Sequence, residues 1–75
     1  MNYIQLLDCE EELKALKTAQ NALRNCTAVS YRMGADMSFL ANLDRSLRGL
    51  DARIREVESV ESQLNSILEQ QENRL

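Results

Sequence analysis

Apolar and small side chains recur along the chain at intervals of three and four residues, in two separate segments. The first segment carries Leu6, Cys9, Leu13, Leu16, Ala19, Leu23 and Cys26. The second carries Met37, Leu40, Leu43, Leu47, Leu50, Ile54, Val57, Val60, Leu64 and Ile67. Such intervals place side chains on one stripe of an α-helix, so the pattern predicts two amphipathic helices.

Steps of three and four residues alternate through most of both segments, which is typical of helices that pack knobs into holes. Extra three-residue steps interrupt the alternation at Leu16–Ala19, Leu40–Leu43 and Val57–Val60. Such interruptions disfavour one long, regular coiled coil. We therefore expect shorter helices that pack side by side.

The helical pattern fails between the two segments. Residues 27–31 are poor in strong helix formers, and Gly34 follows where a left-handed residue would end a helix. Asp36 or Ser38 is suited to cap the next helix by accepting a hydrogen bond from a free backbone N–H. The sequence therefore predicts a turn here.

The predicted fold is all-α, a two-helix antiparallel hairpin with coiled-coil-like packing. It is one unit over residues 1–75, with helix one over about 3–31, a turn over about 32–36 and helix two over about 37–73. A competing interpretation ends helix one near Asn25 and makes residues 27–33 extended, because Thr, Val and Tyr favour strands.

The spacing of charged residues is also the one expected of helices. Acid-first pairs four residues apart are Glu10–Lys14, Asp44–Arg48 and Asp51–Arg55. Residues 44–55 carry a net charge of +2, whereas residues 56–72 carry five glutamates and no base. These adjacent blocks are either an ordinary solvated surface or a pattern that sets register against a partner helix.

Composition argues against catalysis and cofactors. The chain has 75 residues, no His and no Trp, which leaves little to build a pocket or a general base. Glu10, Glu11 and Glu12 are consecutive and fan out around a helix, so they form no metal site. We expect no enzyme, no cofactor, no metal and no small-molecule substrate.

The chain also lacks the features of several other classes. Its net charge of −3 argues against nucleic-acid binding, and it contains no apolar run long enough for a membrane span. Cys9 and Cys26 lie about 25 Å apart on a continuous helix, too far for an intrachain disulfide. We expect both to be buried small hydrophobes in a reducing, cytoplasmic setting.

Apolar residues beyond the main stripe suggest contacts with another chain. Helix two is predicted to outrun helix one by roughly 10 Å, and we expect Leu64, Ile67, Leu68 and Leu75 in that overhang to have no partner in the hairpin. A second apolar face is formed by Tyr3, Ile4, Leu7, Val29, Tyr31, Met33 and Phe39. Gly49, inside helix two, is either a tolerated surface glycine or a place of close helix approach or bending.

The turn and the first half of helix two contain Gly34-Ala35-Asp36, Phe39, Leu40, Leu43, Arg45, Leu47, Leu50-Asp51 and Ile54. Here the chain resembles the small helical-hairpin co-chaperones of type III secretion needle subunits. The resemblance implies a cytoplasmic, non-enzymatic protein that pairs with a larger helical-repeat chaperone and keeps the needle subunit soluble. It also implies that the apolar residues over 39–54 are packing positions.

The sequence therefore predicts a protein–protein assembly module that binds a helical partner. The expected contact residues are Phe39, Leu40, Leu43, Leu47, Leu50, Ile54, Val57, Leu64 and Ile67. The stripe also resembles that of small coiled-coil subunits of eukaryotic multiprotein complexes. That alternative and a self-assembling homo-oligomer stay open.

Overall fold

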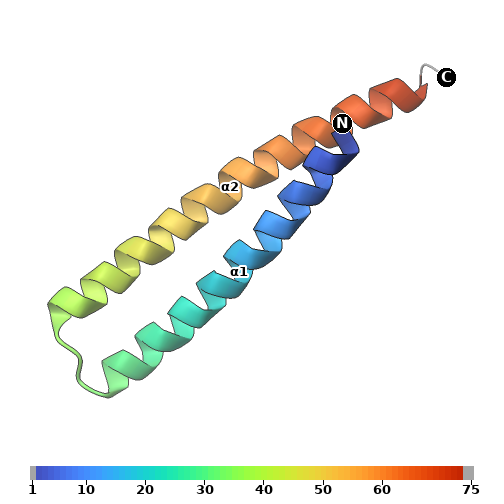
Figure 1. Cartoon of the computed structure of the whole chain (residues 1–75). Coiled ribbons are helices and arrows are strands. Elements are labelled where there is room, and N and C mark those ends of the chain that lie inside the picture. Colours follow the sequence, from blue (N-terminus) through green and yellow to red (C-terminus); the bar gives the residue numbers. More distant parts are fainter. Residues whose placement is uncertain (1, 74–75) are drawn as a thin grey trace.

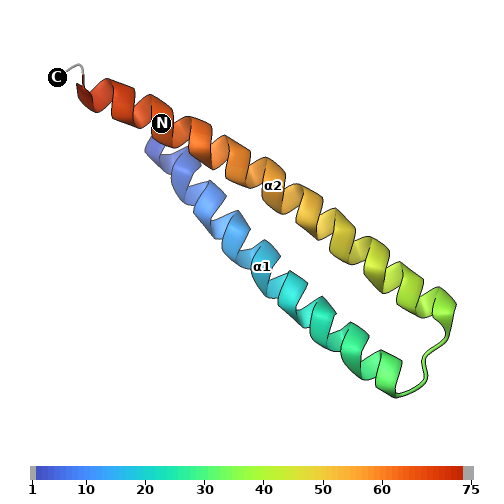
Figure 2. The ribbon, with the colours of Figure 1, turned by 180° about the vertical axis from the view of Figure 1, so that it is seen from behind.

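The structure, a computed structural model, describes residues 2–73 of the chain. Two helices, α1 (Asn2–Arg32) and α2 (Met37–Asn73), run antiparallel and pack against each other, which confirms the all-α hairpin (Figure 1). The molecule measures 61 × 15 × 14 Å. Seen from behind, α2 continues past the start of α1 at the end that holds both termini (Figure 2).

Helix α1 continues without a break through the segment that is poor in helix formers. The Thr27 hydroxyl donates a hydrogen bond of 2.8 Å to the carbonyl oxygen of Leu23, one helical turn earlier. The Met33 amide donates to the carbonyl oxygen of Val29 at 2.9 Å. The extended alternative for residues 27–33 is therefore wrong, because packing against α2 and these local bonds outweigh a weak strand preference.

The turn is closed by local backbone chemistry. Gly34 has a φ of 81°. The Ala35 amide donates to the Ser30 carbonyl at 2.9 Å, and the Gly34 amide donates to the Tyr31 carbonyl at 3.1 Å. These two bonds form a Schellman motif, whose left-handed residue is glycine because a Cβ there is strained.

Helix α2 begins at a side-chain cap. One carboxylate oxygen of Asp36, Oδ1, accepts a hydrogen bond of 3.0 Å from the backbone amide of Phe39. The Asp36 carbonyl accepts from the Leu40 amide at 3.1 Å, the first turn of the helix. Of the two predicted caps, Asp36 is therefore the one that is used.

The packed positions follow a regular alternation of three and four residues, which we call the core seam. On α1 the seam residues with buried or half-buried side chains are Leu6, Cys9, Leu13, Leu16, Gln20, Leu23, Thr27 and Ser30. On α2 they are Leu40, Leu43, Leu47, Leu50, Ile54, Val57, Glu61, Leu64 and Leu68. The alternation has no extra three-residue step, so the predicted interruptions at Leu16–Ala19 and Val57–Val60 are wrong.

Polar residues account for this correction. Ala19, Cys26 and Val60 were predicted to face the other helix but are exposed. Their seam places are taken by a neighbour one residue further along, Gln20 for Ala19 and Glu61 for Val60. A sequence pattern that follows apolarity alone passes over polar residues at packed positions. Met37, also assigned to the stripe, is exposed at the first turn of α2.

The buried core lies in one half of the hairpin. Its members are Cys9, Leu13, Ile54, Val57 and Leu64, with Leu6 and Leu16 packed against them. All of these belong to residues 2–19 and 51–73, which we call the terminal half. Fully burying one such aliphatic side chain contributes about 1.5–3 kcal/mol, so this half holds the two helices together.

Leu64 does not belong to an overhang. Its side chain is buried in the core, Leu68 is half-buried, and Ile67 is exposed. The prediction that Leu64 lacks a partner in the hairpin is therefore wrong, because α1 reaches far enough to cover it. Leu75 lies outside the described residues.

Candidate partner-binding surface

The other half of the hairpin, residues 20–50, which we call the turn half, is packed less completely. Four leucines of the α2 core seam lie there, Leu40, Leu43, Leu47 and Leu50, and all four are only half-buried. The α1 seam of this half is polar at Gln20, Thr27 and Ser30. Three of the four core-seam residues that α1 contributes here are therefore polar, and none of the four leucines is buried.

A groove of about 440 Å³ opens in this half. It is lined by Arg24, Thr27, Ala28, Tyr31, Met37, Leu40 and Leu47, from both helices. The large side chains at its rim are accessible, since Tyr31 is 72% and Met37 77% exposed. Concave, mostly apolar surfaces of this kind are typical of binding sites, and an accessible apolar area on a small chain is a natural contact for another protein.

The predicted contact residues separate into three groups. Ile54, Val57 and Leu64 are buried between the two helices, so they stabilise the hairpin itself. The four leucines of the turn half are half-buried. Phe39 and Ile67 are 39% and 41% exposed. The structure therefore leaves the predicted stripe accessible mainly in the turn half and at these two side chains.

Gln20 is a buried polar residue that the apolar pattern does not reveal. It is 9% exposed. Its Nε2 donates a hydrogen bond of 3.3 Å to Oδ1 of Asp51, whose Oδ2 accepts from Arg55 at 3.2 Å. A buried amide needs such a partner, and this one comes from the opposite helix. A step of four residues from Leu16 keeps the alternation regular and leads to Gln20. This spacing is the sequence signal for its buried position.

Ion pairs link the two helices along their edges. Arg53 donates two hydrogen bonds to the carboxylate of Glu12, at 2.6 and 3.0 Å, and one to Glu56 at 3.2 Å. Lys17 lies 3.8 Å from Glu58. The hydrogen bonds from Arg53 to Glu12, and then to Glu56, raise the pKa of the guanidinium above the ordinary arginine value. These hydrogen bonds therefore favour the charged form of Arg53.

Two of the three predicted pairs within a helix are confirmed. Arg48 lies 2.8 Å from Asp44, and Arg55 lies 3.2 Å from Asp51. Glu10 and Lys14 form no ion pair in the described structure. Exposed pairs contribute about 0–1 kcal/mol each, so these contacts within α2 add little to the stability of the hairpin.

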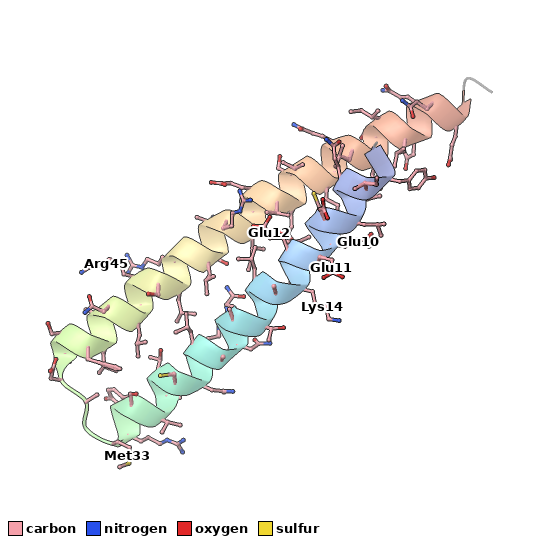
Figure 3. The ribbon with its side chains drawn as sticks, viewed as in Figure 1. Glu10, Glu11, Glu12, Lys14, Met33 and Arg45 are labelled. Carbon is pink, nitrogen blue, oxygen red and sulfur yellow. The ribbon has the colours of Figure 1, made fainter. Side chains whose placement is uncertain are left out.

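The acidic side chains near the start of α1 do not converge on one point. Glu12 points toward α2, whereas Glu10, Glu11 and Lys14 lie on the outer side of α1 (Figure 3). Within residues 2–73 no group of three His, Cys, Asp or Glu side chains is placed to hold a metal ion. Neither α1 nor α2, as described, is long and apolar enough to cross a membrane.

The two cysteines differ in environment. Cys9 is buried in the core, as predicted, but Cys26 is exposed, and its Sγ lies 3.9 Å from the Ser30 hydroxyl. The prediction for Cys26 is wrong because Thr27 takes the seam position.

Gly49 has open space around it, since an added Cβ would meet no atom within 4 Å. Packing within this chain therefore does not require a glycine there.

Comparison of the chain with family models, curated proteins and solved structures finds no match. The resemblance to needle co-chaperones therefore stays a prediction from the residues at the turn and over 39–54. The geometry of the hairpin is what remains to indicate a function.

Proposed function

We propose that this chain is a non-enzymatic protein–protein assembly module, a helical hairpin that binds a further helix in its turn half. The observation that carries the proposal is the half-buried state of Leu40, Leu43, Leu47 and Leu50, which α1 opposes largely with polar side chains. A helix from another chain would supply the apolar contacts that α1 lacks. This is the helix-in-groove mode of recognition.

The needle co-chaperones that the sequence resembles would use such a surface in the cytoplasm. The small size of the core supports the same proposal. A single core in a chain of 75 residues rarely supplies more than about 3–5 kcal/mol without a partner. Among the described residues, the buried apolar side chains of the core all lie in one half of the hairpin.

A pair of substitutions tests the proposal through the molar mass in solution. We expect Leu47→Asp to reduce association at least tenfold, because it replaces an apolar contact surface of the groove with a charged group that binding would remove from water, while Arg45→Ala leaves association unchanged. Arg45 is exposed on the outer side of α2 (Figure 3). Tyr31→Gln is a second test that touches only the rim of the groove and spares the hairpin. Equal effects of Leu47→Asp and Arg45→Ala would contradict the proposal, and circular dichroism checks that each variant stays helical.

A further inference from the structure

Beside the core seam, α1 carries a second series of positions, each but Tyr3 one residue after a core-seam position. At alternating steps of four and three residues it contains Tyr3, Leu7, Glu10, Lys14, Lys17, Asn21, Arg24, Ala28 and Tyr31. Every one of these side chains is exposed in the hairpin. We call this series the outer seam; it repeats the spacing of the core seam because it lies one residue further along the same helix. Its apolar members, Tyr3, Leu7, Ala28 and Tyr31, lie near its two ends.

Most pairs of positions in the outer seam are complementary to each other; the remaining pair is Lys14 with Asn21. Read from its two ends toward its middle, Tyr3 corresponds to Tyr31 and Leu7 to Ala28. Further in, Glu10 corresponds to Arg24, an acid to a base. An antiparallel twofold pair brings these positions together, because residue i of one copy meets residue j of the other and residue j meets residue i.

We propose that two copies of this chain associate through their outer seams, with the two α1 helices antiparallel and a twofold axis near Lys17. This inference rests on the proposed function and names its partner as a second copy. In this register Tyr3 and Leu7 of each copy lie against Tyr31 and Ala28 of the other. Glu10 of each copy faces Arg24 of the other.

The groove of the turn half belongs to the same face. Arg24, Ala28 and Tyr31 are part of the outer seam and also line the groove. The exposed Tyr3 and Leu7 of one copy therefore have a concave apolar site to enter on the other. The dimer would contain two such sites, one at each end, and each would cover half-buried leucines of α2.

The charges of the hairpin fit an antiparallel pair. The turn half carries four arginines and two aspartates, a net charge of +2. The terminal half carries ten acids and four bases, a net charge of −6. An antiparallel dimer places unlike halves side by side, whereas a parallel dimer places like halves together. At the twofold axis the two Lys17 ammonium groups are compensated by Glu58, 3.8 Å away in each chain.

Glu10 and Arg24 are suited to a test of this register. Neither makes an ion pair in the described structure. They lie about 21 Å apart along α1, so they cannot interact directly within one chain. Any coupling between substitutions at these two positions must therefore arise across a dimer.

The experiment measures the dimer dissociation constant by sedimentation equilibrium, with reducing agent present. We expect Glu10→Arg and Arg24→Glu each to weaken the dimer by roughly fivefold, because each dimer contains two copies of the pair. The double variant restores affinity to within about twofold of the unmodified chain. Glu11→Arg and Arg45→Glu make the same charge changes off the outer seam and should have little effect.

Three results would overturn the inference. One is a dimer in which the double variant is no tighter than the single variants. Another is a chain that stays a poorly helical monomer at every concentration, in which case the missing contacts come from a different protein and the proposed function stands. The third is a monomer that is fully helical and unfolds cooperatively, which would contradict the proposed function as well.

Discussion

At the scale of single residues, the turn depends on Gly34 and Asp36. Gly34 occupies a left-handed conformation that closes the end of α1, and the Asp36 carboxylate accepts the Phe39 amide at the start of α2. Both roles are local, because they require only the backbone of the neighbouring residues. They set the direction in which α2 returns along α1.

Gly34→Ala is expected to lower the free energy of unfolding by about 1–2 kcal/mol, because an L side chain is strained at a φ of 81°. Gly49→Ala is the matched control. Gly49 lies in the middle of α2 with open space around it, so the same substitution there should raise the free energy of unfolding by about 0.5–1 kcal/mol. Thermal unfolding at a fixed protein concentration measures both. A loss of stability in Gly49→Ala would indicate that another helix approaches at that position.

At the scale of the helices, the sequence predicts the number, direction and approximate length of the elements, and it predicts the turn in detail. These features depend on local signals such as Gly34, Asp36 and the apolar spacing. The same spacing misplaces Ala19, Cys26 and Val60, because it admits only apolar residues.

The weakly packed turn half follows from what the apolar spacing omits. Gln20, Thr27 and Ser30 take core seam positions on α1, and a polar residue at such a place becomes visible only when α2 lies opposite. The groove and the half-buried leucines can therefore be recognised only when the two helices are seen packed together.

Thr27→Leu is expected to stabilise the hairpin by about 1 kcal/mol and to weaken association. The new leucine side chain fills part of the groove next to Leu40. It therefore makes, from α1, an apolar contact that a partner helix would otherwise make. Thr18→Leu is a close control. Like the Thr27 hydroxyl, the Thr18 hydroxyl donates a hydrogen bond to a backbone carbonyl one turn earlier, that of Lys14, at 2.8 Å. Unlike Thr27, Thr18 has an exposed side chain. If the two substitutions change the molar mass equally, the groove is not the site of association.

At the scale of the whole molecule, the hairpin is asymmetric along its 61 Å length. The terminal half contains the buried core and most of the acidic residues, while the turn half contains the groove and a net positive charge. We infer that its fold and its assembly are coupled, so that the occupied groove completes the packing.

The most direct test is the molar mass of the purified chain by light scattering over a hundredfold range of concentration, with far-ultraviolet circular dichroism on the same samples. We predict that the helical content increases with concentration and that the molar mass rises above 8.6 kDa with it, because association supplies the contacts that the turn half lacks. A mass of 8.6 kDa at every concentration, with full helical content and cooperative unfolding, would contradict it. That result would mean that the hairpin needs no further helix.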